Sequence, residues 1–374
     1  MPGRWVPITW QGQAAKAWQP SFIADVELAP SVDLARRTER ASAAAKRADE
    51  RIPASWEPLT RMLLRAEGIA SSDIEGLRAP MEEVAIAVVD DRAAGPTAGW
   101  IADNLAVVTD AVATSQQRLT IKRLQQWHTR LMRHGSLPAE LVGRFRPSQG
   151  WIGGASPVNA VYVPPPAESV DSLMTDLVAF ANRDDLDPVS QAAVLHAQFE
   201  TIHPYGDGNG RLGRVLIGWL LARRLGLALP PPVSVLIARD PGRYLSSLLL
   251  FRQESPDPLI SWFADLVTRA GEASLDLGEQ VRVLLTDWDQ RLRGLRADAA
   301  ARRVAAQLPA QPVINAALAA EGAEVSERSA RNAIALLVGR GILAQLETTD
   351  TGVGRPRSWW VSRELLELVT TWPS

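Results

Sequence analysis

Apolar residues recur every three to four positions along most of this chain, which is the spacing of one buried helix face. Ser31 is suited to cap the first helical stretch, and Asp187 with Pro188 is suited to open a later one. The segments with this spacing are 31–70, 77–135, 168–183, 187–202, 211–226, 242–253 and 258–295. The pattern predicts a mostly α fold.

Strand-like sequence is limited to few places. Residues 143–166 combine β-branched and aromatic side chains with glycines and prolines, which predicts a short hairpin that ends in a proline tract. Residues 1–30 contain aromatics and turn residues without a clear period, so we expect an ordered N-terminal arm there. The hairpin is thus the one strand pair predicted before the C-terminal segment.

From residue 300 onward three short helical segments precede a strand-rich stretch, which is the order of a winged helix. Eight arginines stand against seven acidic residues in this segment, so its charge is nearly neutral. Counterion release on DNA requires several phosphate contacts. The arginines that form a small basic patch on the third helix and wing are Arg328, Arg331, Arg355 and Arg357. Domain packing or target recognition is at least as compatible with this segment as DNA binding.

The composition narrows the chemistry. A net charge of -2 over 374 residues gives no overall attraction to nucleic acid or to an anionic membrane. The chain has no cysteine, which excludes disulfides, thiolate zinc sites and cysteine nucleophiles. Imidazole chemistry is therefore limited to His128, His134, His196 and His203.

The most apolar stretch, Val215–Val233, is interrupted by Arg223 and Arg224 and then by three prolines from Pro230. It falls short of the roughly 20 apolar residues that span a bilayer, so it predicts a buried helix. The N-terminus lacks a basic region followed by an apolar core. We expect a cytoplasmic protein without membrane contact.

The segment from His203 to Arg214 reads HPYGDGNGRLGR and carries the densest set of chemical groups in the chain. Its alternating glycines allow tight backbone and leave amide groups free to face an anion. These glycines are Gly206, Gly208 and Gly210. A helix is expected to begin between Asn209 and Arg211, so its positive end favours a phosphate in the same space. Arg211 and Arg214 add forked, permanently charged donors.

Two further residues of this loop point to group transfer. Asp207 suits a hard divalent cation that bridges it to phosphate oxygens, because Mg²⁺ takes one or two carboxylates together with substrate oxygens. His203 is placed to accept a proton from an incoming hydroxyl. The combination predicts phosphoryl or nucleotidyl transfer.

Other interpretations of the loop fit less well. The spacing of Gly208, Gly210 and Gly213 matches a dinucleotide fingerprint, but it follows a helix and lacks a βαβ unit. A Walker loop requires Gly-Lys-Ser/Thr, which is absent. His196 and His203 are seven positions apart and do not form a zinc motif, so His196 is expected to support the core.

The loop resembles the signature of the Fic family, HxFx(D/E)GNGRxxR, with Tyr205 in place of the phenylalanine. The resemblance covers about residues 60–270. It implies a Fic-type helical core with a β-hairpin flap, followed by a winged-helix domain. The implied domains are an N-terminal arm and helical segment (1–95), a catalytic core (96–275), and a linker helix with the winged helix (276–374).

By this resemblance the chain transfers AMP from ATP to a serine, threonine or tyrosine hydroxyl of a target protein and of itself. His203 is then the general base, and Asp207 holds Mg²⁺. The implied nucleotide-binding residues are Gly206, Gly208, Asn209, Gly210, Arg211 and Arg214. The flap between Gln149 and Tyr162 would pair with an extended target segment as an added strand. The flap residues expected to dock the target are Trp151, Ile152, Gly153, Val161 and Tyr162.

A second match lies upstream, where Ser71, Glu75 and Gly76 fit the family's inhibitory pattern (S/T)xxxE(G/N). The resemblance implies that Glu75 pairs with Arg214 and occupies the charge meant for the γ-phosphate. The chain would then belong to the subgroup with an N-terminal inhibitory helix.

Two alternative functions stay open at this point. The same loop could remove AMP from a modified protein, with Glu75 positioning water. The chain could also be a winged-helix DNA-binding regulator with a disused core. The sequence leaves the target protein and formation of a homodimer undetermined.

Overall fold

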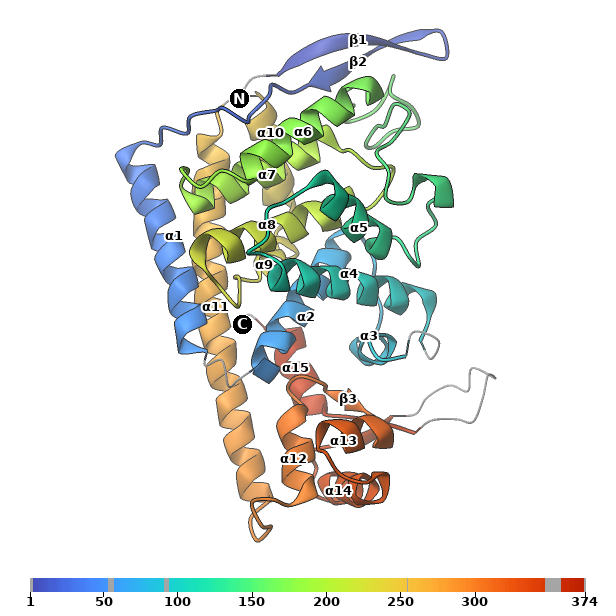
Figure 1. The fold of residues 1–374 in the computed structure, drawn as a ribbon, viewed down its shortest axis with the longest axis vertical. Helices are drawn as coiled ribbons and strands as arrows, with labels where there is room; N and C mark the ends of the chain where they lie inside the picture. The colour runs from blue at the N-terminus through green and yellow to red at the C-terminus, as the bar shows by residue number, and fades with distance from the viewer. Residues whose placement is uncertain (1–2, 53–56, 91–93, 254, 347–357, 373–374) are drawn as a thin grey trace.

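The computed structural model describes residues 3–52, 57–90, 94–253, 255–346 and 358–372, and most of them are helical (Figure 1). The helices before the C-terminal segment are α1 (Val32–Arg51), α2 (Glu57–Ile74), α3 (Met81–Ala87), α4 (Pro96–Ala113), α5 (Ile121–Leu131), α6 (Val170–Ala181), α7 (Pro188–Ile202), α8 (Asn209–Leu225), α9 (Val233–Ile237), α10 (Pro241–Gln253) and α11 (Asp257–Arg291). The prediction of a mostly α fold is confirmed. The side chains of Ser31 and Asp187 accept backbone hydrogen bonds as N-caps of α1 and α7.

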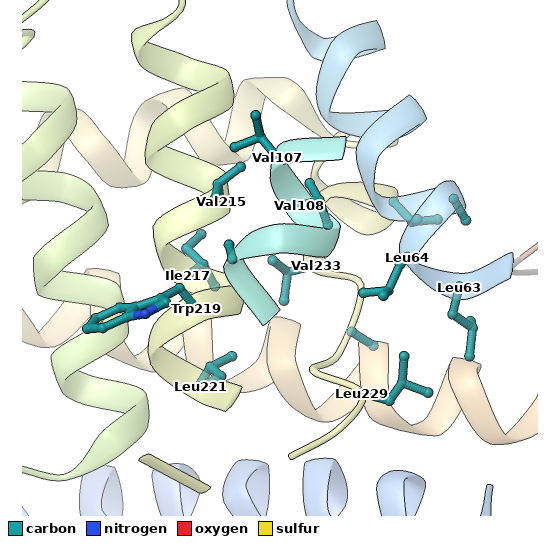
Figure 2. Close-up of a cluster of buried hydrophobic side chains, with 14 of the residues drawn as sticks. Leu63, Leu64, Val107, Val108, Val215, Ile217, Trp219, Leu221, Leu229 and Val233 are labelled. Carbon is teal, nitrogen blue, oxygen red and sulfur yellow. The ribbon is translucent and has the colours of Figure 1, made fainter. Parts of the chain in front are cut away.

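Helices α7 and α8 form the centre of the molecule, because nearly all of their residues are buried. The long helix α11 runs beside α1 (Figure 1). This close approach requires Gly271, since a Cβ there would lie 3.0 Å from the carbonyl oxygen of Ala44. Figure 2 shows apolar side chains such as Leu64, Val108 and Val215 meeting from α2, α4 and α8. The ends of α7 and α8 are therefore held by the main core.

The N-terminal arm is a β-hairpin. The prediction that residues 143–166 form the one strand pair before the C-terminal segment was therefore wrong. Strand β1 (Arg4–Trp10) pairs antiparallel with β2 (Gln13–Gln19). Gln11 and Gly12 form the turn with φ of 48° and 80°, which is the left-handed backbone that two-residue hairpin turns require. The hairpin is only partly buried, so its alternation is weak in the sequence.

The apolar stretch from Val215 is divided between two helices. Helix α8 ends at Leu225, where Gly226 with φ of 71° closes the helix, and α9 begins at Val233. The predicted buried helix is thus confirmed for the first part of the stretch. Among the described residues, no helix is both long and apolar enough to cross a membrane.

The predicted hairpin between residues 143 and 166 is reduced to a single antiparallel bridge, which joins Ile152 to Tyr162. No longer strand forms there, because Gly153 and Gly154 adopt left-handed φ values of 67° and 74° immediately after the bridge. The prediction of a β-hairpin flap was therefore too regular. We keep the name flap for residues 149–162.

In its described residues, the C-terminal segment contains four helices and a small sheet. Its elements are α12 (Ala300–Gln307), β3 (Val313–Ile314), α13 (Ala316–Gly322), α14 (Glu327–Gly339), β4 (Ala344–Leu346), β5 (Trp359–Val361) and α15 (Arg363–Thr371). The sheet has the order β3-β5-β4 with antiparallel pairs. The sequence interpretation omitted β3 and α15. The wing arginines Arg355 and Arg357 lie outside the described residues.

Hydrogen bonds and apolar packing tie this segment to the rest of the molecule. Trp288 and Arg291 of α11 both donate to Glu364 of α15. The sheet residues Val313 and Trp359 pack with Ala85 and Ile86 of α3. Helix α11 continues to Arg291, so the predicted boundary between residues 275 and 276 falls inside one helix.

Candidate active site

The loop that connects α7 to α8 is shaped at both ends by left-handed backbone. His203 has φ of 49° at the end of α7, and Gly208 has φ of 77° as the cap of α8. A non-glycine residue at positive φ is uncommon and occurs where the surrounding structure enforces it. The loop therefore turns sharply and brings the C-terminus of α7 to the N-terminus of α8.

The side chain of Asn209 is hydrogen-bonded to the backbone of the loop. Its Oδ1 accepts a hydrogen bond from the backbone amide of Tyr205 at 2.9 Å, and its Nδ2 donates to the Tyr205 carbonyl at 2.9 Å. Both polar atoms of the side chain are thus engaged with the loop backbone. Asn209 shapes the anion site in this structure instead of facing it.

His128 of α5 supports the loop from below, a role that the sequence did not indicate. Its ring stacks on Tyr205 at 3.9 Å between centroids. Its Nδ1 accepts from the amide of Gly143, so the proton lies on Nε2, which donates to the carbonyl of Asp207 at 3.0 Å. Burial lowers the pKa of His128 to about 4, so the imidazole ring stays uncharged near neutral pH.

Arg146 fastens the loop to the base of the flap. Its Nε donates to the carbonyl of His203 at 2.9 Å, and its Nη2 donates to the carbonyl of Pro165. Its backbone amide also donates to Pro204. A single buried guanidinium therefore holds the two segments together, and neither periodicity nor a motif in the sequence indicated this contact.

An anion site opens at the first turn of α8. Arg211 is buried, and its Nε and Nη1 have no hydrogen-bond partner among the described residues. Its guanidinium lies over the ring of Trp100, 4.7 Å from the centroid. A buried cation with unpaired donors beside a helix N-terminus attracts an anion with several oxygen acceptors.

Asp207 is exposed beside this anion site, and its Oδ1 accepts from the amide of Gly208 at 2.6 Å. No cluster of three or more metal-binding side chains occurs in the part of the chain that the structure describes. One free carboxylate oxygen suits Mg²⁺ that arrives with phosphate oxygens and water as its other ligands. The residues present therefore fit a cation that binds together with a nucleotide.

Arg214 is enclosed by the residues of the upstream pattern. Its side chain is 1% exposed, and its Nη2 donates to Glu75 Oε1 at 2.7 Å. Its Nε donates to Ser71 Oγ at 2.9 Å, and Nη2 also reaches the Ser71 carbonyl. The Glu75 side chain, at 39% exposed, lies at the mouth of the site. The structure thus brings the two separate motifs together, while Gly76 forms the turn after α2 with φ of 77°.

Helix α2, which carries this pattern, is fixed by buried polar contacts along its length. Glu67 accepts from both the backbone amide and the hydroxyl of Ser234 at the start of α9. Asn104 of α4 donates to the Gly68 carbonyl at 2.7 Å and to Ser72 Oγ at 3.2 Å. Each of these hydrogen bonds contributes about 0.5–1.5 kcal/mol net, so together they hold α2 against the core.

Gly210 allows Glu75 to reach the loop, because a Cβ at this position would collide with Glu75 Oε1. We expect Gly210→Ala to destabilise the protein by about 1–3 kcal/mol, despite the better helix propensity of alanine. In a Glu75→Gly background this collision is absent and only a 3.0 Å approach to Arg214 Nη1 remains, so the same substitution should destabilise the protein less. Thermal unfolding of the four proteins tests this coupling, and equal changes in both backgrounds would contradict it.

The flap residues differ in what they present to solvent. Val161 is 86% exposed and Ile152 is partly exposed, so both are available to a partner. Tyr162 is buried, its hydroxyl donates to the Thr201 carbonyl at 2.7 Å, and Arg252 lies over its ring. Trp151 packs edge-on against Trp10 of the N-terminal hairpin. Tyr162 therefore anchors the flap to α7, and the prediction that it docks a target does not fit its burial.

The fold and the loop define a helical protein that brings buried arginine donors, an imidazole and a metal-compatible carboxylate together at one site. Residues 118–221 match the model of the Fic/DOC family, so the chain contains a Fic/DOC domain. The matched segment spans α5, the flap, the loop and most of α8. Ser71 and Glu75 lie upstream of it.

Named relatives agree with this domain. The chain is 31% identical over 174 residues to protein adenylyltransferase Fic of Drosophila erecta, covering 45% of this chain and 32% of that protein. Identity to protein adenylyltransferase Fic of Drosophila melanogaster is 30% over 174 residues, with the same coverage of 45% and 32%. The chain thus spans about a third of the length of these curated relatives.

Solved structures support the fold. A Fic family protein from Desulfovibrio desulfuricans G20 superposes with a TM-score of 0.56 at 19% identity, covering 89% of this chain and 97% of that one. A Fic-1 fragment from C. elegans superposes with a TM-score of 0.51 at 16% identity, covering 66% and 74%. The first match extends well beyond the segment that the family model covers.

Proposed function

We propose that this chain is a protein adenylyltransferase that moves AMP from ATP to a hydroxyl group of a target protein. The buried, unpaired donors of Arg211 at the N-terminus of α8 carry the proposal, because they require an anion with several oxygens. The names of the relatives support the same reaction. The imidazole of His203 and the carboxylate of Asp207 supply, in one loop, the other groups that nucleotidyl transfer needs.

In the proposed reaction, the phosphates of ATP bind at Arg211 and at the first amides of α8. His203 takes the proton of the target hydroxyl while the hydroxyl oxygen forms a bond to the α-phosphorus. The bond from that phosphorus to the bridging oxygen breaks, and pyrophosphate leaves. Asp207 would hold Mg²⁺, which when bound neutralises phosphate charge. Arg214 binds the γ-phosphate once Glu75 has moved away.

The pH dependence of this reaction follows from the environment of His203. Burial, followed by the charges of Arg146 and Arg252, lowers its pKa to about 4. A lowered pKa keeps the imidazole neutral down to low pH, so the His203 ring of the Glu75→Gly variant should stay uncharged from about pH 7.5 to about pH 5.5. The ¹⁵N chemical shifts of labelled histidine measure this directly, apart from any other group that titrates in the site. Protonation of His203 centred near pH 6.5, the usual imidazole value, would contradict it.

We propose further that Glu75 restrains this activity. Its carboxylate holds the Arg214 guanidinium that would otherwise face the γ-phosphate. The same position beside the loop supports a second candidate, removal of AMP from a modified protein, with the partly exposed carboxylate positioning a water molecule.

The elements from α12 to β5 follow the order of a winged helix, and we propose that fold for the C-terminal segment. Its basic patch is reduced, because Arg331 is paired with Glu327. This favours a role in packing or target recognition over the alternative of a DNA-binding regulator. A salt-dependent shift with duplex DNA, together with no ATP turnover, would favour the regulator instead.

Mass spectrometry tests the proposed function most directly. Cell lysate incubated with ATP and the Glu75→Gly variant should contain peptides that carry an adenylyl group on a hydroxyl side chain, identified by adenine fragment ions. The His203→Ala counterpart is the matched control. Loss of adenylyl groups from premodified protein, without any new ones, would assign the removal reaction.

A further inference from the structure

Two buried polar atoms near the loop have no hydrogen-bond partner among the described residues. They are Nδ1 of His203 and Oε1 of Glu200. The second carboxylate oxygen, Oε2, lies 4.0 Å from Nδ1. A distance of 4.0 Å is longer than a hydrogen bond, but a shift of about 1 Å would close it. The pair is therefore arranged for a contact that forms when the site tightens.

The fold keeps this carboxylate next to the imidazole. Glu200 lies in the last turn of α7, three residues before His203, whose left-handed backbone turns the chain there. Gly213 of α8 leaves the space for the carboxylate, because a Cβ there would collide with Glu200 Oε1. Neither residue is free to move far, since α7 and α8 are buried along most of their length.

We propose that Glu200 is a positioning residue that holds His203 in the tautomer with its proton on Nδ1, so that Nε2 keeps its lone pair for the target hydroxyl. This inference rests on the proposed function and specifies how the base is set. An ionised carboxylate only accepts hydrogen bonds, and a neutral imidazole has one N–H. A carboxylate at Nδ1 therefore leaves Nε2 as the basic nitrogen.

Charges from several elements act on this carboxylate. Burial raises the pKa of Glu200 to about 7, while Arg214 of α8 and Arg252 of α10 lower it and Glu75 raises it. The pKa of the Tyr244 hydroxyl on α10 is itself raised, first by burial and then by Glu200. In the nucleotide-free protein, displacement of Glu75 from Arg214 removes a negative neighbour, which lowers the pKa of Glu200 and favours the ionised acceptor. The restraint by Glu75 and the setting of the base are thus linked.

The backbone carbonyl of Glu200 also acts on the His203 ring. A test must therefore separate the side chain from the backbone. Glu200→Gln does so, because the amide keeps the size of the side chain but can donate a hydrogen bond to Nδ1. A donor at Nδ1 selects the opposite tautomer.

Nitrogen NMR of the full chain with ¹⁵N-labelled histidine reads the tautomer directly. The chain has only four histidines, so His203→Gln assigns the His203 signals. In wild type and in Glu75→Gly we expect the proton on Nδ1, and in Glu200→Gln a shift toward Nε2. Asp176→Asn is the matched control, since this carboxylate accepts from the backbone amides of Ile23 and Ala24, and the His203 signals should not change.

Two results would overturn the proposal. A wild-type His203 with its proton on Nε2 would do so without any variant, even if Glu200→Gln failed to fold. An unchanged tautomer both in folded Glu200→Gln and in folded Glu200→Leu, whose side chain has no acceptor for Nδ1–H, would assign the backbone carbonyl as the group that holds the ring. Because NMR needs no turnover, it remains informative if the proposed transfer reaction proves wrong.

Kinetics supply a second readout in the Glu75→Gly background. Glu200→Gln should lower kcat by about 10²-fold or more with little change in the KM for ATP, because the wrong tautomer cannot accept the hydroxyl proton. Glu200→Asp keeps the charge at a greater distance and should recover part of the rate. Equal rates for Glu200→Gln and its parent would contradict the role.

Discussion

Replacing Glu75 with glycine is expected to raise adenylyl transfer about tenfold or more, equivalent to about 1.4 kcal/mol of transition-state stabilisation. Among the described residues, Glu75 supplies the one carboxylate oxygen that contacts the buried guanidinium of Arg214. Removing Glu75 therefore leaves the positive charge of Arg214 available to the γ-phosphate. Glycine should fold normally, because Glu75 follows the last residue of α2 and breaks no helical turn. Auto-labelling with ATP radiolabelled at the α-phosphate measures the gain.

The charge of Glu75, as distinct from its bulk, is tested by Glu75→Gln. The amide has the same shape but forms a weaker bond to a guanidinium than a carboxylate does. We expect an intermediate gain for Glu75→Gln and little gain for Glu75→Asp, which keeps the charge. Equal labelling by wild type and Glu75→Gly would show that this ion pair has no restraining role.

Replacing His203 with alanine is expected to reduce transfer by about 10²–10⁴-fold, the usual contribution of a general base. The affinity for ATP should change little, because the imidazole acts on the target hydroxyl and the phosphates bind at α8. Calorimetric titration with ATP and single-turnover labelling, both in the Glu75→Gly background, separate the two quantities.

Arg211→Ala provides the contrasting variant. Its unpaired donors face the anion site, so its loss should weaken ATP binding before it affects the chemical step. If His203→Ala instead lost nucleotide affinity and kept its transfer rate at saturation, the imidazole would belong to the binding site and another group would be the base.

The sequence predicted the helical framework well, because caps and helical periodicity are local signals. Ser31 and Asp187 were placed correctly as caps from residue type alone. The N-terminal hairpin was missed, since its strands are only partly buried and their alternation is correspondingly faint. The flap was predicted as regular strands because its β-branched residues are visible in the sequence, while the left-handed backbone of Gly153 and Gly154 is not.

The candidate site also contains some residues that the sequence predicted and others that it did not. The loop residues are adjacent in sequence, so residue type and spacing were enough to predict their chemistry. The contact of Arg214 with Glu75 spans 139 positions and was anticipated only through a resemblance. His128 and Arg146 act through buried contacts between different elements, which composition and spacing do not encode. The proposed role of Glu200 likewise depends on its approach to His203 across the end of α7.

The buried contacts of α2 with Ser234 and Asn104 determine the timescale of the proposed restraint. Opening a packed helix takes microseconds to seconds, whereas a partly exposed side chain changes rotamer within picoseconds to nanoseconds. Only the Glu75 side chain has to move, so the restrained and open states exchange rapidly during a catalytic cycle. The restraint is then an equilibrium population, and a ligand raises activity in proportion to its preference for the open state.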